Sequence, residues 1–463
     1  MKLRWFILFL LLFAFVSYRV VRRDSNRPPQ DGDAAEVHNI AYSLAHGRGY
    51  SFDWNDERWR SLWQDQNAGG RFDFILVRRG AYPTMFRPPL MPILVAGILE
   101  VFPRDSFRAW RIFDSAAFAV AACLLSDVAF VQGGTAGMVA ILLILVGDPL
   151  RRAYLPGWGT EGLAFVFVSL IAWLVANSGR FRPAWYNLTA GFAVGLLCLD
   201  RSIFVLAMPC ICLVLAIART KTRAGIVKDG LLILVVATSV QMPWWVRNIT
   251  VSGRLMPLGT QGGVSLPDEY GDVALDTGGE WTGRGIRDAW IPPSQANRPI
   301  PIPPGFSEES FQKLWTANPG DDASDHRFDA MLYAAVCTSL ESEIEVSAAG
   351  QRAAVAWVRA NYAKVPGLMA RKAFALTFSK RRYLAVALLL GVIGFLGFPK
   401  LRRTISCLAL LIASYVLAVA LTHVVYNRFL LPILPPLYLG TAWGISAIAR
   451  LARRRICALF SPI

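Results

Sequence analysis

The stretch PLMPILVAGILEVF, residues 89–102, decides how the rest of this chain is arranged, because every later segment changes sides if it crosses the membrane. It is apolar but contains Pro92 and Glu100. A spanning helix needs about 20 residues, and apolar runs of about 10 to 14 are typical of interfacial or re-entrant segments. The sequence therefore predicts that residues 89–102 lie at the membrane surface without spanning.

The composition sets the class of protein. Hydrophobic residues make up 54% of the 463 residues, and 15 of these residues are Trp, which excludes a water-soluble globule of this length. The net charge of +16 alone would suggest a nucleic-acid partner. The basic residues, however, form short clusters between apolar runs. We therefore expect an all-α polytopic integral membrane protein with no nucleic-acid partner.

Ten further apolar runs have about the length of a membrane span. We expect about ten transmembrane helices from these runs, with juxtamembrane helices in the first external loop. The runs lie near residues 5–21, 110–131, 134–148, 162–177, 184–200, 202–218, 230–246, 383–398, 404–422 and 430–449.

The distribution of Lys and Arg sets the orientation, because these residues accumulate in short cytoplasmic loops. If residues 89–102 do not cross, 13 basic residues fall in the cytoplasmic loops and 7 in the short loops opposite. The cytoplasmic set is Arg180, Arg182, Arg219, Lys221, Arg223, Lys228, Lys400, Arg402, Arg403, Arg450, Arg453, Arg454 and Arg455. This topology predicts a multi-pass protein of the plasma (inner) membrane with both termini in the cytoplasm.

The chain then divides into six segments. Residues 1–21 are expected to be an uncleaved N-terminal anchor, with a cleaved secretory signal as the alternative. Residues 22–108 form the first external loop, 109–246 a transmembrane core, and 247–382 a second external loop with a small helical module. Residues 383–449 are expected to be C-terminal transmembrane helices, and 450–463 a basic cytoplasmic tail.

The first external loop opens with a helix signature. Val37, Ile40, Ala41, Leu44 and Ala45 recur at helical spacing, and the pattern stops at two glycines. We expect this helix to lie flat on the membrane.

Asp33 falls at the start of this helix, with Glu36 three residues later. One interpretation is a capping box that satisfies free backbone amides. The other is a catalytic base, which the helix dipole would keep ionised. Asp31-Gly32-Asp33 also spells the DxD signature of soluble nucleotide-sugar glycosyltransferases, but no nucleotide-binding βαβ pattern surrounds it.

A wider pattern joins this loop to the rest of the chain. The loop reads GD, an amphipathic helix, GRGYS and, several dozen residues later, RPPLMP. PGWGTEG precedes the fourth span, WWVRN and GRLMPLGTQGG follow the seventh, and YNRFLLPILP opens the tenth. In this order the motifs resemble the GT-C superfamily of polyprenyl-phosphate-sugar glycosyltransferases, which includes the protein O-mannosyltransferases and the lipid A aminoarabinose transferases.

The resemblance implies a role for five residues. Asp33 matches the aspartate that acts as general base on the acceptor, and Glu161 matches a second acidic position that positions the acceptor or the base. Arg87 matches the basic residue that neutralises the lipid-linked phosphate. Arg428 and, more weakly, Arg201 are further candidate phosphate ligands. The superfamily often has Asp-Glu at its first position, whereas this chain has Ala34 after Asp33.

The chemistry agrees with these roles. A sugar carried on a lipid phosphate leaves a phosphate monoester behind, so negative charge builds on oxygen in the transition state. Arginine stays protonated and can bind phosphate oxygens through two parallel hydrogen bonds. One base and one cationic clamp suffice for a single inverting displacement without a metal. His38, His46, His326 and His423 lack zinc-ligand spacing, so neither metal nor cofactor is expected.

Other interpretations stay open. Arg87 could be an arginine snorkelling to the interface, Glu161 a first-turn acid and Arg428 a juxtamembrane anchor. A transporter or flippase of lipid-linked saccharides would also present arginines to phosphate, and a non-catalytic assembly partner could share the fold. The expected partners are a polyprenyl-phosphate sugar, membrane lipids, and a glycan, lipid or protein acceptor.

The second external region changes character along its length. Residues 257–304 are rich in Pro and Gly and are expected to form irregular loops over the site. A helical pattern then runs through Ala353, Val355, Trp357, Val358, Tyr362 and Val365 and stops before Pro366. We expect a small helical module that selects the acceptor.

Overall fold

The computed structural model describes residues 3–23, 28, 32–64, 78–104, 106–149, 160–279, 337–379, 382–423 and 427–459. Part of the predicted motif PGWGTEG, residues 156–159, lies outside these ranges, as do Asp31, Tyr426 and residues 280–304. Within the described ranges the chain is almost entirely helical, with one short pair of strands.

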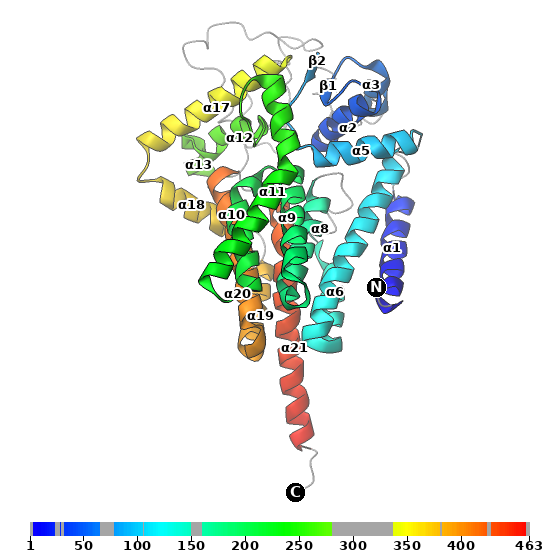
Figure 1. Cartoon of the computed structure of the whole chain (residues 1–463), viewed down its shortest axis with the longest axis vertical. Helices are drawn as coiled ribbons and strands as arrows, with labels where there is room; N and C mark the ends of the chain where they lie inside the picture. Colours follow the sequence, from blue (N-terminus) through cyan, green and yellow to red (C-terminus); the bar gives the residue numbers. More distant parts are fainter. Residues whose placement is uncertain are drawn as a thin grey trace.

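Helices form the bundle and most of its upper end (Figure 1). Their bounds are α1 (Leu3–Arg23), α2 (Gly32–Ala45), α3 (Glu57–Gln64), α5 (Leu90–Val101), α6 (Ser106–Gly147), α8 (Glu161–Ala176), η1 (Ser178–Arg180), α9 (Pro183–Asp200), α10 (Ile203–Arg219), α11 (Arg223–Ser252), α12 (Gln261–Glu269), α13 (Asp272–Thr277), α17 (Leu340–Ala360), α18 (Val365–Phe374), η3 (Ala375–Ser379), α19 (Arg382–Gly397), η4 (Pro399–Leu401), α20 (Arg402–Thr422), η5 (Asn427–Ile433) and α21 (Leu434–Leu459). The strands are β1 (Ser51–Asp53) and β2 (Ala81–Pro83).

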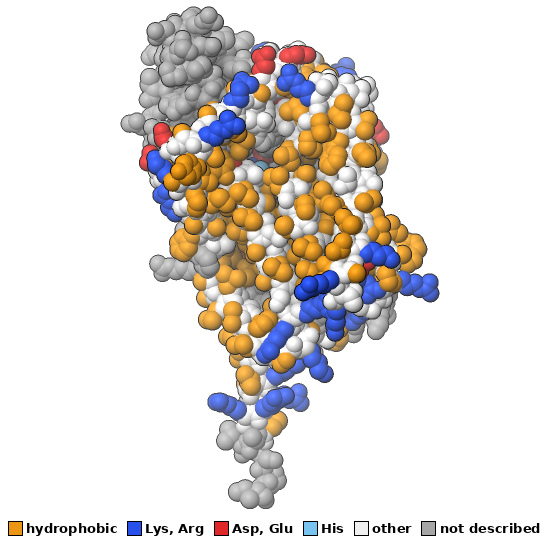
Figure 2. Space-filling model, turned by 60° about the vertical axis from the view of Figure 1, so that its left-hand side comes forward, with side chains coloured by type: hydrophobic (Ala, Val, Ile, Leu, Met, Phe, Trp, Pro, Cys, Tyr) orange, Lys and Arg blue, Asp and Glu red, His pale blue; other side chains and the backbone are white. Residues whose placement is uncertain are grey.

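The long helices run side by side along the long axis, and α2, α3, α5 and α17 gather at the upper end (Figure 1). Figure 2 shows a broad hydrophobic belt around the middle, basic side chains below it and mixed charges above it. A belt of this kind is the surface that a bilayer's hydrocarbon core covers. The chain is a polytopic all-α membrane protein, as the sequence predicted.

The predicted spans coincide with helices. Among the described residues, four helical stretches are long and apolar enough to cross a membrane: 106–147, 223–252, 399–422 and 428–455. Shorter apolar helices cover 7–18, 161–176, 203–219 and 383–397. The number of crossings, ten, stays a prediction.

Two predicted spans meet inside α6. Gly134 interrupts the helix with φ 72° and ψ −163°, between the ranges 110–131 and 134–148. This backbone conformation strongly favours glycine, because a Cβ would clash there. α6 therefore consists of two helical segments joined at a kink, and its two membrane crossings stay a prediction.

The stretch that decides the arrangement forms α5, which lies crosswise to the bundle at the upper end (Figure 1). It packs against α2, and Met91, Val95 and Leu99 are buried on its inner side. Ile93 and Val101 remain exposed. This position agrees with the predicted surface segment.

The helix around Asp33 differs from the prediction in one respect. α2 has the predicted extent, but residues 34–41 are buried on all sides, including the polar Glu36, His38 and Asn39. Trp59 Nε1 donates to His38 Nδ1 over 3.0 Å, and Asn39 bonds to the backbone of Asp53. The segment that follows α2 therefore covers the polar face that a surface helix would expose.

The second external region is also more ordered than predicted. Residues 261–277 form α12 and α13 where irregular loops were expected. α17 begins at Leu340, well before the predicted pattern, and Pro366 lies in the first turn of α18, where its missing N–H costs no hydrogen bond. α12 packs closely on α17, which stabilises both helices.

The upper end has its own hydrophobic core, which includes four tryptophans. Trp54, Trp59, Trp63 and Trp110 are fully or almost fully buried there. Beside them β1 pairs antiparallel with β2, with Phe52 opposite Tyr82. β2 leads directly into the loop that carries Arg87, so this core sets the position of that loop.

Candidate active site

The predicted site residues come from five separate parts of the chain. Asp33 lies in the first turn of α2, Arg87 in the loop before α5 and Glu161 at the start of α8. Arg201 follows α9, and Arg428 lies in η5. The structure brings all five into one continuous series of ion pairs.

Asp33 lies between two arginines. Its Oδ1 is 2.5 Å from Arg87 Nη2, and its Oδ2 is 2.6 Å from Arg428 Nη1. Burial alone would raise the pKa of the Asp33 carboxyl, but the Arg428 and Arg87 guanidinium groups outweigh it and hold that pKa below its usual range. Asp33 is therefore ionised throughout the neutral and mildly acidic range.

Arg428 also connects Asp33 to Glu161. Its Nε lies 3.5 Å from Glu161 Oε1, and Arg201 Nη1 lies 2.8 Å from the same oxygen. Both arginines lie near the Phe429 ring, 5.0 Å for Arg201 and 5.7 Å for Arg428. Glu161 thus orients two cations on the side of the site opposite Arg87.

Glu36 and Arg78 also belong to the series, although neither was predicted as a site residue. Arg87 donates through Nε to Glu36 Oε2 over 2.7 Å and through Nη2 to the same oxygen, and Arg78 Nη2 lies 2.7 Å from Glu36 Oε1. Glu36 therefore binds arginines and does not act as the predicted capping partner. Glu36 follows Asp33 by three residues, so both acids lie on one face of the helix. This spacing could have identified Glu36 as a site residue from the sequence.

Among the described residues, the series contains four arginines and three carboxylates. Exposure is uneven: the Asp33 and Arg428 side chains are 29% and 22% exposed, whereas those of Glu36, Glu161 and Arg201 are below 10%. The Asp33–Arg428 pair in the middle of the series is therefore the place where a solvent-borne or lipid-borne group can reach it.

The Arg87 loop is held from two sides. Tyr50 donates its hydroxyl to the carbonyl oxygens of Arg87 and Pro88, over 2.7 and 3.2 Å. Arg247 of α11 donates to the carbonyl oxygens of Thr84 and Tyr50, over 2.6 and 2.7 Å. The Arg247 guanidinium also lies 5.1 Å from the Tyr50 and Trp244 ring centres.

Glu343 of α17 links this loop to the second external region. Its carboxylate accepts from Thr84 Oγ1 over 2.6 Å, from the Met85 amide over 3.0 Å and from Thr260 Oγ1 over 2.5 Å. Burial raises the pKa of Glu343, and these hydrogen bonds offset only part of that effect. Glu343 had no recognisable signal in the sequence, because its partners are far away along the chain. Arg247 lies in the motif WWVRN but was not predicted as a site residue.

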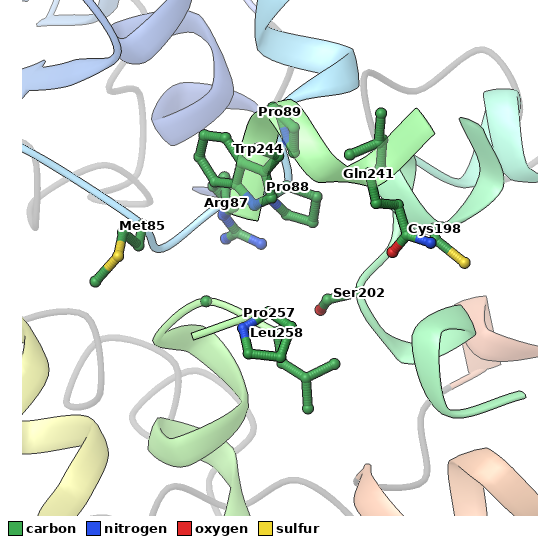
Figure 3. A pocket seen from close by; sticks show the side chains of 12 residues that line it. Met85, Arg87, Pro88, Pro89, Cys198, Ser202, Gln241, Trp244, Pro257 and Leu258 are labelled. Carbon is green, nitrogen blue, oxygen red and sulfur yellow. The ribbon is translucent and has the colours of Figure 1, made fainter. Parts of the chain in front are cut away.

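A pocket opens beside Arg87 (Figure 3). The loop 85–89 and Trp244 form one side, residues 257–259 lie opposite, and Ser202 and Gln241 are at the third side. Figure 3 shows the Arg87 guanidinium extending into the space above Pro257 and Leu258. The walls combine apolar side chains with the Arg87 guanidinium and with the polar side chains of Ser202 and Gln241.

The described residues contain no cluster of His, Cys, Asp or Glu suited to holding a metal ion. Independence from metals and cofactors stays a prediction.

Comparison with known proteins gives a limited result. No family model matches the chain, and no curated protein matches it. Among solved structures, the chain is similar to ArnT from Cupriavidus metallidurans bound to undecaprenyl phosphate, with 14% identity, a TM-score of 0.42, and coverage of 98% of this chain and 79% of ArnT. It is also similar to the apo state of ArnT, with 14% identity, a TM-score of 0.40, and coverage of 97% and 78%.

Proposed function

We propose that this protein is a membrane glycosyltransferase that moves a sugar from a polyprenyl-phosphate donor to an acceptor, with inversion and without a metal. The observation that carries the proposal is the Asp33 carboxylate held between Arg87 and Arg428 at the exposed middle of the ion-pair series. The site would face the non-cytoplasmic side of the plasma membrane, because the clustered basic side chains lie below the belt, at the opposite end (Figure 2).

The arginines supply the electrostatic part of the reaction. As the bond between the anomeric carbon and the phosphate oxygen breaks, negative charge grows on the leaving phosphate. Arg87, beside the pocket, and Arg428 can donate hydrogen bonds to that charge. Fixed donors of this kind contribute about 10² to 10³ in rate each.

Asp33 acts as the general base on the acceptor hydroxyl. Its depressed pKa keeps the carboxylate ionised, so it can take the proton of an acceptor hydroxyl while the acceptor oxygen attacks the anomeric carbon. In the structure, both of its oxygens contact arginines. A bound donor phosphate competes for Arg87 and Arg428, which frees the carboxylate for the acceptor. Donor binding would therefore make the Asp33 carboxylate available to accept a proton.

Glu161 and Arg201 act around this centre. Glu161 holds the Arg428 guanidinium from the side opposite Asp33, and Arg201 balances the Glu161 charge. We assign Glu161 to the positioning of Arg428, and Arg201 to a weaker, indirect role in phosphate binding. The acceptor is a glycan, lipid or protein whose hydroxyl reaches Asp33.

The test compares Asp33→Asn with Asp56→Asn. Asp56 pairs with Arg48 outside the site and serves as the matched control. Mass spectrometry of envelope lipids and glycans is performed on a deletion strain complemented with each variant. We expect Asp33→Asn to lose the transferred sugar and Asp56→Asn to keep it.

Binding of undecaprenyl phosphate to purified protein completes the test. Asp33→Asn should bind at least as tightly as wild type, because the two arginines lose an anionic competitor. A transporter or flippase would keep its activity in Asp33→Asn, and a non-catalytic assembly partner would show no loss specific to this residue. Either outcome would overturn the proposal.

A further inference from the structure

The second external region carries an unusual concentration of positive charge. Between Arg352 and Arg382 the sequence has eight basic residues and no Asp or Glu. The start of α17 is the opposite, with Glu341, Glu343 and Glu345. The predicted topology places this basic stretch away from the cytoplasm, where an excess of Lys and Arg is not expected. We therefore looked for an anionic binding partner that would explain these basic residues.

The cations share one face of α17 with large apolar side chains. Arg352, Val355 and Arg359 follow each other at spacings of three and four, so they form one stripe along the helix, and Tyr362 lies in the turn just beyond its last residue. Val355 is 48% exposed and Tyr362 76%, and both arginines are exposed. None of the described residues forms an ion pair or a hydrogen bond with either arginine side chain.

The other face of α17 is already occupied. Ala354 is buried together with Tyr270, Ala274 and Leu368, and Trp357 donates its indole N–H to Asp272 over 2.9 Å. The helix therefore cannot rotate to hide the stripe against the protein. Lys364 in the following turn and Phe374, which is 61% exposed, extend the same mixture of cations and apolar groups to α18.

The position of this surface identifies its level in the membrane. α18 is followed by η3, which ends at Ser379, and α19, one of the apolar helices of the bundle, begins shortly after it at Arg382. Figure 1 shows α17 and α18 on the outer side of the molecule, toward the end that holds α2 and α5. The stripe thus lies where the hydrocarbon core gives way to lipid headgroups.

We propose that Arg352, Val355, Arg359, Tyr362 and Lys364 form a binding surface for anionic phospholipid headgroups on the site side of the membrane. Tyrosine and aliphatic side chains insert between headgroups, while arginine and lysine attract their phosphates. An acidic protein would satisfy the cations but would leave Val355 and Tyr362 without the apolar layer that lies beside them in a bilayer. This surface is independent of glycosyl transfer.

The test is hydrogen–deuterium exchange of the full chain in nanodiscs of phosphatidylcholine alone or with phosphatidylglycerol. In wild type, phosphatidylglycerol should slow exchange in peptides covering 352–364 by about fivefold or more, the factor that one cation contributes near an anionic surface. High salt should reduce this difference, because exposed charges are screened. The triple variant Arg352→Ser, Arg359→Ser, Lys364→Ser should lose it.

Arg254→Ser is the matched control, since Arg254 is another exposed arginine toward the same end and lies off the stripe. It should keep the lipid effect at 352–364. Peptides covering α12 report whether the triple variant still packs α12 on α17. Equal exchange in both lipids for wild type, or a lipid effect that survives in the triple variant, would overturn the inference. So would protection that needs an added acidic protein.

Discussion

Arg428 joins the two carboxylates of the candidate site and is the member whose loss changes most. It contacts Asp33 on one side and Glu161 on the other, and it is among the more exposed members of the series. Among the opposing charges that lower the pKa of Asp33, Arg428 has the largest effect. A substitution of Arg428 therefore tests how the ion-pair series controls the pKa of Asp33.

We predict that Arg428→Gln makes the reaction sensitive to mild acid. Burial would then raise the Asp33 pKa with only Arg87 to oppose it, so the base becomes protonated as the pH falls from 7 to 5. The ratio of transfer rates at pH 7 and pH 5 should be near one for wild type and several-fold larger for the variant. Arg254→Gln should behave like wild type, and an unchanged ratio in Arg428→Gln would contradict the assigned base.

The same ion pairs have a consequence for folding. Because the folded-state pKa of Asp33 is depressed, its ionisation stabilises the fold at pH values above about 4, the usual pKa of aspartate. This contribution is lost only as the pH falls through the lower, folded-state pKa. Asp33 therefore favours folding across the whole range in which the enzyme assay is made.

At the scale of elements, the site depends on how α17 holds two loops. Glu343 is the shared acceptor for Thr84, Met85 and Thr260, and it belongs to none of the helices that carry the predicted site residues. Arg87 follows Met85 by two residues, so the position of its guanidinium depends on this contact.

We expect Glu343→Ala to loosen both loops. Removal of the carboxylate leaves buried donors without an acceptor, at a cost on the order of 3 kcal/mol. Hydrogen exchange should speed up in peptides covering 84–89 and 257–260. Glu343→Gln should retain most of the protection, because the amide can still accept from the Met85 N–H. Glu345→Ala, on the exposed side of α17, is the control, and equal effects of the two alanine variants would refute this role.

Packing between α19 and α21 gives a second prediction at this scale. A Cβ on Gly444 would collide with the backbone of Leu390, whereas a Cβ on Gly440 would meet Gly391 at an ordinary 3.4 Å. Gly444→Ala should lower the free energy of unfolding by about 1 to 3 kcal/mol because the helices must separate. Gly440→Ala is the matched control one turn away. Thermal melting in detergent measures both, and equal melting temperatures would show that α19 and α21 do not pack this closely.

The two ends of the molecule differ in their surface side chains. Hydrophobic side chains form the belt, basic side chains gather at the lower end, and the ion-pair series lies toward the upper end with α2 and α5 (Figures 1 and 2). The two ends of a membrane protein meet different compartments, so this difference makes a direct prediction about accessibility.

We predict that Ser61→Cys, in the exposed part of α3, reacts with a membrane-impermeant maleimide in intact spheroplasts. The native Cys457, exposed near the end of α21, should react only after permeabilisation. A Cys457→Ser background separates the two signals. Labelling of Cys457 from outside would mean that the predicted orientation is inverted, and labelling of both from outside would contradict an even number of crossings.

Much of the fold could be predicted from the sequence by itself. Apolar runs are a local property, so they located the helices of the bundle, the break between the predicted spans 110–131 and 134–148, and the short α5. The resemblance of the motifs to the GT-C superfamily also singled out Asp33, Arg87, Glu161, Arg201 and Arg428. Their chemical roles remain predictions, but their proximity is a structural fact.

Only the tertiary structure decided how these residues meet. Glu36 looked like a helix cap, yet it binds Arg87 and Arg78, and Glu343 reaches Thr84 across 259 positions in sequence. Hydrophobic periodicity acts within one helix and leaves a trace in a few neighbouring residues. An ion pair or a buried hydrogen bond needs only that two side chains end within about 3 Å of each other. That condition is set by the packing of distant elements, so no local pattern records it.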